Sequence, residues 1–322
     1  MNLPTVFMFS GQGSQHYQMG IALYEAEPVF RRAMMRMDIA YADLTGHSLL
    51  EHLYGRQDAS SPFEELALTH PAIVMVECAL AEMLMSEGIV PTLSLGCSLG
   101  SFSAAAASGW VSSENALAMA IHQAKAVQAY CEAGTMIAIL GSHIQHASKL
   151  ASLGAIVAAE NFDRHFIVSA HLHDLEKILA YLHANDLASQ ILPVQRAFHT
   201  PWLDPAKSHF VEHVAPSIPG KVLRELWCCA SAGPVASMCP QYFWDVVQKP
   251  IRFAETIRKL ELQGPWRYVD LGPSGTLATF LKYLLPATSR SCTVATLSRV
   301  GRDQQCLRDL RAACQAVLCA EN

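Results

Sequence analysis

Apolar side chains in the first part of the chain follow two spacings in turn, which predict strands and helices. Residues 5–9 form a β-type apolar run, and residues 89–95 form a second one. Between them, residues 71–86 repeat their apolar side chains at helical spacing. Ser112 can cap the start of a further helix over residues 116–131. Because strands separated by helices pair in parallel, we expect a mostly parallel sheet with helices on its faces.

The middle of the chain has a different pattern, with short strands set close together. Two helical segments, near residues 146–153 and 175–184, separate these strands. The strand candidates are residues 135–140, 155–159, 166–169 and 190–192. A β-α-β-β-α-β order is typical of a ferredoxin-like fold. We therefore expect a ferredoxin-like subdomain over residues 128–196, inserted into a core made of residues 1–127 and 197–322.

The composition indicates a folded protein with a large core. Of the 322 residues, 51% are hydrophobic and 16% are charged, and the net charge is −5. Without a basic cluster the chain offers no electrostatic site for nucleic acid, and a mildly acidic protein is not attracted to an anionic membrane. Its apolar runs look too short to span a bilayer. The ten cysteines lack C-x-x-C spacing, so we expect reduced thiols and a cytoplasmic protein.

The strongest chemical signal is the run G-C-S-L-G at residues 96–100, centred on Ser98. A G-x-S-x-G run between a strand and a helix can form a nucleophile elbow, a tight turn that exposes the serine hydroxyl. The small side chains of residues 101–109 predict the helix that such a turn needs. A glycine-flanked serine in an ordinary turn is the competing interpretation.

Four other motifs accompany this run. They are SGQGSQ at residues 10–15, RAFHTP at 196–201, KPIRF at 249–253 and VDLGPSG at 269–275. Together, and in this order, they resemble the malonyl-CoA:acyl carrier protein transacylase family, which includes the acyltransferases of polyketide synthases. The sequence FMFSGQGSQ at residues 7–15 is most similar to that of the discrete acyltransferase-like acyl hydrolases of trans-acyltransferase polyketide pathways. The resemblance covers nearly the whole chain and implies an α/β-hydrolase-like large domain with a parallel sheet and an inserted ferredoxin-like subdomain.

The resemblance assigns one serine and one histidine to catalysis. A serine hydroxyl is a poor nucleophile until a base takes its proton, and of the 14 histidines it is His199 that lies in the family's motif. Ser98 and His199 are 101 positions apart, so the fold must bring them together. The family orients its histidine with a backbone carbonyl, which matches Arg252 here. Asp204 and Asp270 are carboxylate alternatives for a full triad, and we favour the dyad.

A tetrahedral intermediate needs two N–H donors, and the resemblance implies the backbone amides of Gln12 and Leu99. A phosphate-binding loop is the competing interpretation of GQGSQ, but the loop lacks the P-loop lysine. The histidine pairs at 143/146 and 171/173 have no cysteine or carboxylate at a matching spacing, so we expect no metal. No cofactor is implied beyond the phosphopantetheine that carries the substrate.

Four residues that the resemblance places in or near the acyl pocket bear on which acyl group is bound. Malonyl-type members carry an arginine where this chain has Gln123. A guanidinium binds a carboxylate through two charge-assisted hydrogen bonds, and burying the carboxylate without it costs about 3–5 kcal/mol. We therefore expect Gln123 to face neutral acyl groups and Gln123→Arg to favour malonyl. Phe198 resembles the residue that narrows this pocket. We expect Cys97 to be a packing residue and His70 to be structural or to hold a water.

These observations predict acyl chemistry through an acyl-Ser98 intermediate. The missing arginine favours an acyl hydrolase that releases non-carboxylated acyl groups from acyl carrier protein thioesters, as in proofreading of polyketide biosynthesis. The alternatives are an acyltransferase that moves a neutral acyl group between CoA or carrier proteins, and a non-catalytic partner of the synthase. The expected partners are an acyl carrier protein and polyketide synthase modules, with no nucleic acid and no membrane, and we expect a monomer.

Overall fold

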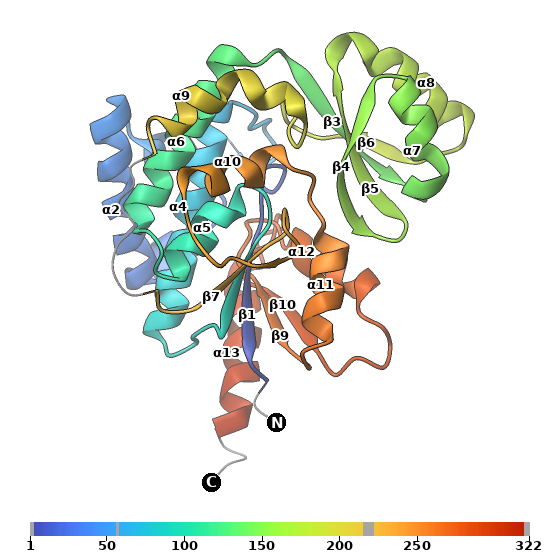
Figure 1. Cartoon of the computed structure of the whole chain (residues 1–322). Helices are drawn as coiled ribbons and strands as arrows, with labels where there is room; N and C mark the ends of the chain where they lie inside the picture. Colours follow the sequence, from blue (N-terminus) through green and yellow to red (C-terminus); the bar gives the residue numbers. More distant parts are fainter. Residues whose placement is uncertain (1–2, 56–57, 215–221, 319–322) are drawn as a thin grey trace.

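The computed structural model describes residues 3–55, 58–214 and 222–318 and contains two sheets (Figure 1). The larger sheet runs through the body of the molecule. The smaller sheet, in light green, stands beside that body and carries its own two helices. This division into a large domain and a subdomain is the arrangement that the sequence pattern predicts.

The larger sheet has the strand order β10-β9-β1-β2-β7-β8. Neighbouring strands pair in parallel, except that β8 pairs antiparallel with β7. Its strands are β1 Thr5–Phe9, β2 Leu93–Gly96, β7 Glu225–Cys228, β8 Gly233–Pro234, β9 Arg267–Asp270 and β10 Cys292–Ala295. Every residue of β1 and β2 is buried, as expected for parallel strands covered on both faces. The predicted parallel sheet is confirmed.

Helices cover both faces of the larger sheet, and β1 serves both. Phe7 and Phe9 belong to the apolar core on the side of α2, α4, α5 and α6, whereas Val6 and Met8 belong to the core on the side of α11 and α12. Successive side chains of a strand point to opposite faces, so one apolar run builds two cores. The helices of the large domain are α1 Ile21–Ala26, α2 Pro28–Thr45, α3 Leu49–Tyr54, α4 Leu66–Ser86, α5 Gly100–Ala107, α6 Ser113–Tyr130, the 3-10 helix η2 Pro201–Ala206, α9 Lys207–Val211, α10 Pro240–Gln248, α11 Phe253–Glu261, α12 Thr276–Leu284 and α13 Asp303–Leu318.

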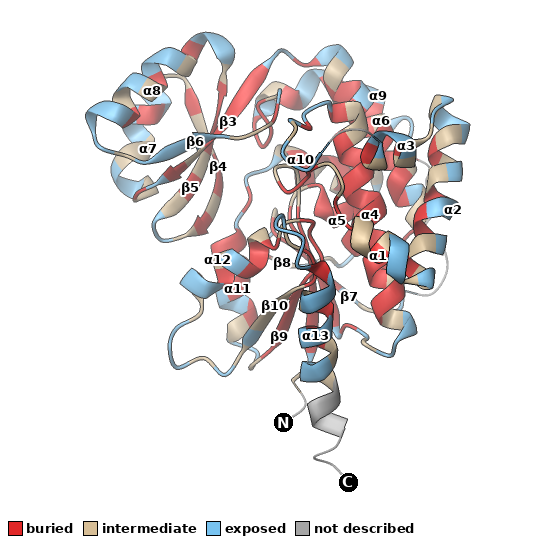
Figure 2. Ribbon diagram, turned by 180° about the vertical axis from the view of Figure 1, so that it is seen from behind, coloured by how far each residue is buried: buried red, intermediate tan, exposed pale blue. Residues whose placement is uncertain are grey.

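Helix α4 is almost wholly buried (Figure 2). By length and composition its 21 residues would be enough to cross a membrane, which corrects the expectation drawn from the apolar runs. However, 83% of its most apolar 18-residue stretch is buried inside the protein, and the helix packs against α2, α5 and α6. Its apolar surface therefore serves the core of the large domain.

The smaller sheet has the strand order β4-β5-β3-β6, and all its neighbouring strands are antiparallel. Along the chain its elements are β3 Gly134–Leu140, α7 His143–Ser152, β4 Ala155–Phe162, β5 His165–His171, the 3-10 turn η1 Leu172–Asp174, α8 Leu175–Ala184 and β6 Ser189–Ile191. This order confirms the ferredoxin-like fold. All of these elements lie within residues 128–196, and their apolar side chains form a separate core.

Backbone hydrogen bonds join the subdomain to the large domain. The Glu160 N–H of β4 donates to the Ile251 carbonyl at 3.0 Å, and the Ile251 N–H donates to the Ala158 carbonyl at 2.8 Å. This parallel bridge pairs Ala159 with Ile251, in the segment just before α11. We call this contact the β4 junction.

Candidate active site

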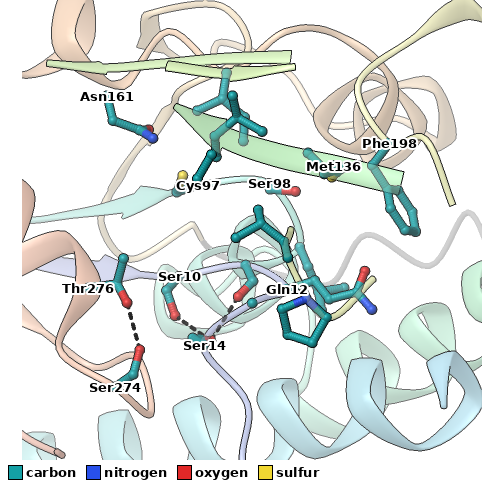
Figure 3. Close-up of a pocket in the computed structure, with 18 of the residues that line it drawn as sticks. Ser10, Gln12, Ser14, Cys97, Ser98, Met136, Asn161, Phe198, Ser274 and Thr276 are labelled. Carbon is teal, nitrogen blue, oxygen red and sulfur yellow. Dashed lines mark hydrogen bonds between the residues drawn. The ribbon is translucent and has the colours of Figure 1, made fainter. Parts of the chain in front are cut away.

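A cavity of about 610 Å³ lies between the larger sheet and the subdomain. Its lining combines the loop after β1, the turn after β2, subdomain strands and the loop before α12. Figure 3 shows Ser98 near the centre, Asn161 and Phe198 on opposite sides, and Gln12 on the facing loop. The carboxyl ends of β1 and β2 open into this cavity, the position where open α/β sheets usually bind ligands.

Ser98 occupies a strained turn between β2 and α5. Its φ is 55°, in the left-handed region that residues other than glycine rarely adopt. The flanking glycines make room for this turn. A side-chain carbon on Gly96 would lie 2.4 Å from the Ser101 Cα, and one on Gly100 would lie 2.2 Å from the Phe9 carbonyl oxygen. The G-x-S-x-G spacing thus has a steric cause, and the turn has the form of a nucleophile elbow.

The loop after β1 closes against this elbow. A side-chain carbon on Gly11 would meet the Ser98 Cβ at 2.9 Å, so only glycine fits there. Glu77 of α4 holds the start of the loop, because its Oε1 accepts hydrogen bonds from the Ser10 N–H at 2.7 Å and from the Ser10 hydroxyl at 3.2 Å. Burial raises the pKa of Glu77 well above its usual range. Sequence reasoning missed Glu77, whose one signal is an acid inside an apolar helical run that also contains Glu82.

The structure brings Ser98 and His199 together. The Ser98 hydroxyl lies 2.8 Å from His199 Nε2, and His199 Nδ1 lies 2.7 Å from the carbonyl oxygen of Lys249. A carbonyl can only accept, so Nδ1 carries the proton and Nε2 is free to accept the serine proton. The prediction that the Arg252 carbonyl orients the histidine is therefore wrong, and Lys249 does so instead. The Arg252 carbonyl accepts from Thr256 inside the first turn of α11.

His199 is buried and electrically neutral. Burial lowers its pKa to about 4, although its hydrogen bond to the Lys249 carbonyl acts in the opposite direction. Its φ is 61°, so the base, like the serine, has a left-handed backbone conformation. A neutral imidazole with a free Nε2 is the form that a general base needs.

Neither carboxylate alternative contacts His199. Asp204 accepts a hydrogen bond from the side chain of Gln248. Asp270 is buried and accepts from the N–H groups of Gly272 and Ala278, each at 2.8 Å, while burial raises its pKa to about 6. The arrangement at Ser98 is therefore a dyad oriented by a backbone carbonyl.

The two predicted oxyanion donors, Gln12 and Leu99, both line the cavity. Within the described part of the chain, neither backbone N–H donates a hydrogen bond. Unpaired backbone donors are rare in folded proteins unless a ligand or water uses them. Their position next to Ser98 fits the expected role, which stays a prediction.

The acyl-pocket residues divide into two groups. Phe198, Cys97 and His70 line the cavity, whereas Gln123 is completely buried behind His70 and does not line it. The expectation that Gln123 faces the substrate directly is thus corrected, because the His70 ring from another helix stands before it. The ring centroids of His70 and Phe198 are 5.5 Å apart. The predicted roles of Phe198 and Cys97 stay predictions.

Among the lining residues that the subdomain adds is a hydrogen-bonded polar pair that sequence reasoning did not assign. Asn161 Nδ2 donates to His165 Nδ1 at 3.0 Å, on the side of the cavity facing the elbow. No motif marks either residue, since only the folding of β4 and β5 over the large domain places them here. Among the described residues, no three histidine, cysteine, aspartate or glutamate side chains cluster as a metal site would require.

Comparisons with known proteins agree with this geometry. Residues 6–319 match the family model of the acyl transferase domain. The chain is 39% identical over 308 residues to the polyketide biosynthesis acyltransferase homolog PksD of Bacillus subtilis, which covers 92% of this chain and 93% of the relative. It is 36% identical over 312 residues to the homolog BaeD of Bacillus velezensis, with 96% of each chain covered.

Solved structures share the fold. A loading acyltransferase from the avermectin modular polyketide synthase has a TM-score of 0.87 at 25% identity, covering 95% of this chain and 99% of that one. The malonyl CoA-acyl carrier protein transacylase of Clostridium perfringens has a TM-score of 0.80 at 21% identity, covering 99% and 100%, and supports the fold alone. The chain belongs to the acyl transferase domain family, together with acyltransferase homologs of polyketide biosynthesis.

Proposed function

We propose that this chain is a serine-dependent acyl hydrolase that releases neutral acyl groups from acyl carrier protein thioesters during polyketide biosynthesis. The observation that carries the proposal is that no buried lysine or arginine is among the described residues that line the cavity around Ser98. Among the described residues that line the cavity, Arg299 is the only lysine or arginine. Arg299 is exposed, and it donates to the carbonyls of Gly13 and Gln15. A carboxylate on the acyl group would therefore be buried without a cation.

The dyad geometry supports a two-step reaction. Ser98 passes its proton to His199 Nε2 as its oxygen attacks the thioester carbonyl. The negative charge that develops on the carbonyl oxygen is stabilised by the N–H groups of Gln12 and Leu99. When the intermediate collapses, the C–S bond breaks and His199 returns the proton to the departing pantetheine thiolate. Ser98 is left as an acyl ester.

The second step repeats the first with water as the nucleophile. His199 takes a proton from water, the hydroxide attacks the acyl-Ser98 carbonyl, and the ester bond breaks. The Ser98 oxygen regains its proton from His199, and the free acid departs. Transfer to a second carrier thiol is the alternative, which family membership favours. Transfer requires that water stay out until the thiol arrives.

The test separates the two outcomes by mass spectrometry. Acetyl-carrier protein is incubated with the enzyme, with and without a second holo-carrier protein. We expect free acetate and holo-carrier protein from the wild type, and neither acyl-enzyme nor acetate from Ser98→Ala. Ser60→Ala, in an exposed loop, is the matched control and should behave as wild type.

Three results would contradict the proposal. Quantitative transfer to the second carrier without free acid would indicate a transferase. An acyl label on Cys97 would overturn the choice of nucleophile. Absence of any acyl-enzyme or turnover with neutral thioesters would favour the non-catalytic alternative.

A further inference from the structure

The ring of His70 is held on three sides. Its Nδ1 lies 2.6 Å from Gln123 Oε1 of α6, and its Nε2 lies 3.2 Å from Gln12 Oε1 on the loop after β1. Its face packs against Phe198, beside the catalytic histidine. His70 is 1% exposed and Gln123 is 0% exposed. The ring thus forms a fixed wall between the cavity and Gln123.

The hydrogen bonds of this wall can be satisfied without a charge. A neutral imidazole has one N–H and one acceptor nitrogen. Gln123 Nε2 is buried and has no partner among the described residues. If the Gln123 amide is flipped, so that Oε1 and Nε2 exchange places, Nε2 donates to His70 Nδ1. The His70 Nε2–H then donates to Gln12 Oε1. Each of these nitrogens then has a partner, which buried polar groups require.

A charged His70 would fit both oxygens as placed, but its surroundings oppose it. Among the described residues no carboxylate hydrogen-bonds the ring, and burial lowers the pKa of His70 to about 3 against a smaller raising effect from Gln123. Desolvation without a counter-charge favours the neutral form. The wall is therefore uncharged at neutral pH.

We propose that His70 determines acyl specificity, by closing the pocket in front of Gln123 with an uncharged, hydrogen-bonded wall that excludes acyl groups bearing a carboxylate. This inference rests on the proposed acyl-Ser98 chemistry. The substrate class is a neutral acyl thioester, and the residue that determines acyl specificity is His70 rather than Gln123. One consequence is that Gln123→Arg, which the sequence alone suggests would admit malonyl, fails as a single change because the new guanidinium stays behind the ring.

The experiment measures how fast acetyl and malonyl thioesters of pantetheine acylate the full chain, by intact-protein mass spectrometry. The variants are Gln123→Arg, His70→Ala and the double variant. We expect Gln123→Arg alone to leave the malonyl-to-acetyl rate ratio nearly unchanged. The double variant should raise that ratio by about 30-fold, the worth of one buried charge-assisted hydrogen bond. His122→Arg places the same charge on the half-buried side of α6, against His213, and should leave the ratio unchanged.

A second pair protects the test against misfolding. His70→Gln, alone and with Gln123→Arg, removes the ring that stands before residue 123 but keeps a polar side chain beside Gln12, and thermal unfolding identifies the variants that fold. We again expect the malonyl-to-acetyl rate ratio to be higher for the double variant than for Gln123→Arg alone. A ratio is informative because a general loss of stability lowers both rates together.

The outcomes distinguish this inference from the proposed function. If Gln123→Arg alone admits malonyl as well as the double variants do, His70 is not the wall and the inference is wrong. It is also wrong if wild-type malonyl acylation rises on acidification and His70→Gln abolishes that rise, because His70 would then bind the carboxylate as a cation. If wild type is acylated by neither thioester, the proposed function fails instead.

Discussion

Ser98 and His199 are both held in left-handed backbone conformations, with φ of 55° and 61°. Such conformations cost on the order of 1–3 kcal/mol each and persist only where the surroundings enforce them. For His199 the enforcement is visible, since its N–H donates to the Val247 carbonyl at 3.0 Å and its Nδ1 donates to Lys249. These enforced backbone conformations hold the Ser98 hydroxyl 2.8 Å from His199 Nε2 before substrate arrives.

The low pKa of His199 predicts an unusual pH profile. The base must be neutral to accept the Ser98 proton, and burial lowers its pKa to about 4. Hydrolysis of an acetyl thioester should therefore keep a constant kcat/KM from about pH 8 to about pH 6 and lose it as the pH falls through about 4. Circular dichroism at each pH verifies the fold. An inflection near 6.5, the ordinary histidine value, would contradict the buried neutral base.

Removing the base tests the same residue directly. His199→Ala should lower kcat by about 10²–10⁴-fold, the usual worth of a general base. His209→Ala is the matched control, since that ring stacks on Tyr130 away from the cavity. Equal activity of the two variants would remove His199 from the mechanism.

At the scale of elements, β1, β2 and α5 meet with no room for a methyl group. A side-chain carbon at Gly100 would lie within 2.5 Å of three backbone atoms of β1 and the loop after it. Gly100→Ala should therefore lower the free energy of unfolding by about 3 kcal/mol or more, because the neighbours are backbone and cannot turn aside. Urea denaturation measures the loss.

Gly46→Ala is the control for this prediction. Gly46 ends α2 with φ of 80°, and a carbon added there would meet no described residue within 4 Å apart from its chain neighbours. It should cost only the left-handed penalty of about 1–2 kcal/mol. Similar losses for the two variants would show that the contact at Gly100 is not tight.

At the scale of the molecule, the β4 junction links the subdomain to the orientation of His199. Ile251, which pairs with β4, lies two positions after Lys249, whose carbonyl holds His199. Ile251→Pro removes the N–H that bonds the Ala158 carbonyl. Since small displacements of catalytic groups are costly, kcat should fall by about 10–100-fold. Ile251→Val keeps the N–H and should retain most of the activity. Full activity of the proline variant would show that the junction does not support the dyad.

Much of this architecture follows from local patterns. The alternation of apolar runs predicted the parallel sheet, and the middle segment predicted the order of the ferredoxin-like subdomain. Boundaries were less well predicted: β2 begins at Leu93 rather than residue 89, and α4 begins at Leu66 rather than residue 71. Helix and strand ends depend on neighbours that a local pattern does not contain.

The sequence by itself determined the elbow, because a tight strand-to-helix turn restricts which residues can flank Ser98. The motif around His199 identified that histidine as the partner of Ser98. Only the tertiary structure decided that Lys249, not Arg252, orients the histidine. That choice depends on how the segment before α11 lies against β4. It also decided that His70 screens Gln123. The two residues are 53 positions apart on different helices, and only the packing of α4 against α6 brings the ring between Gln123 and the cavity.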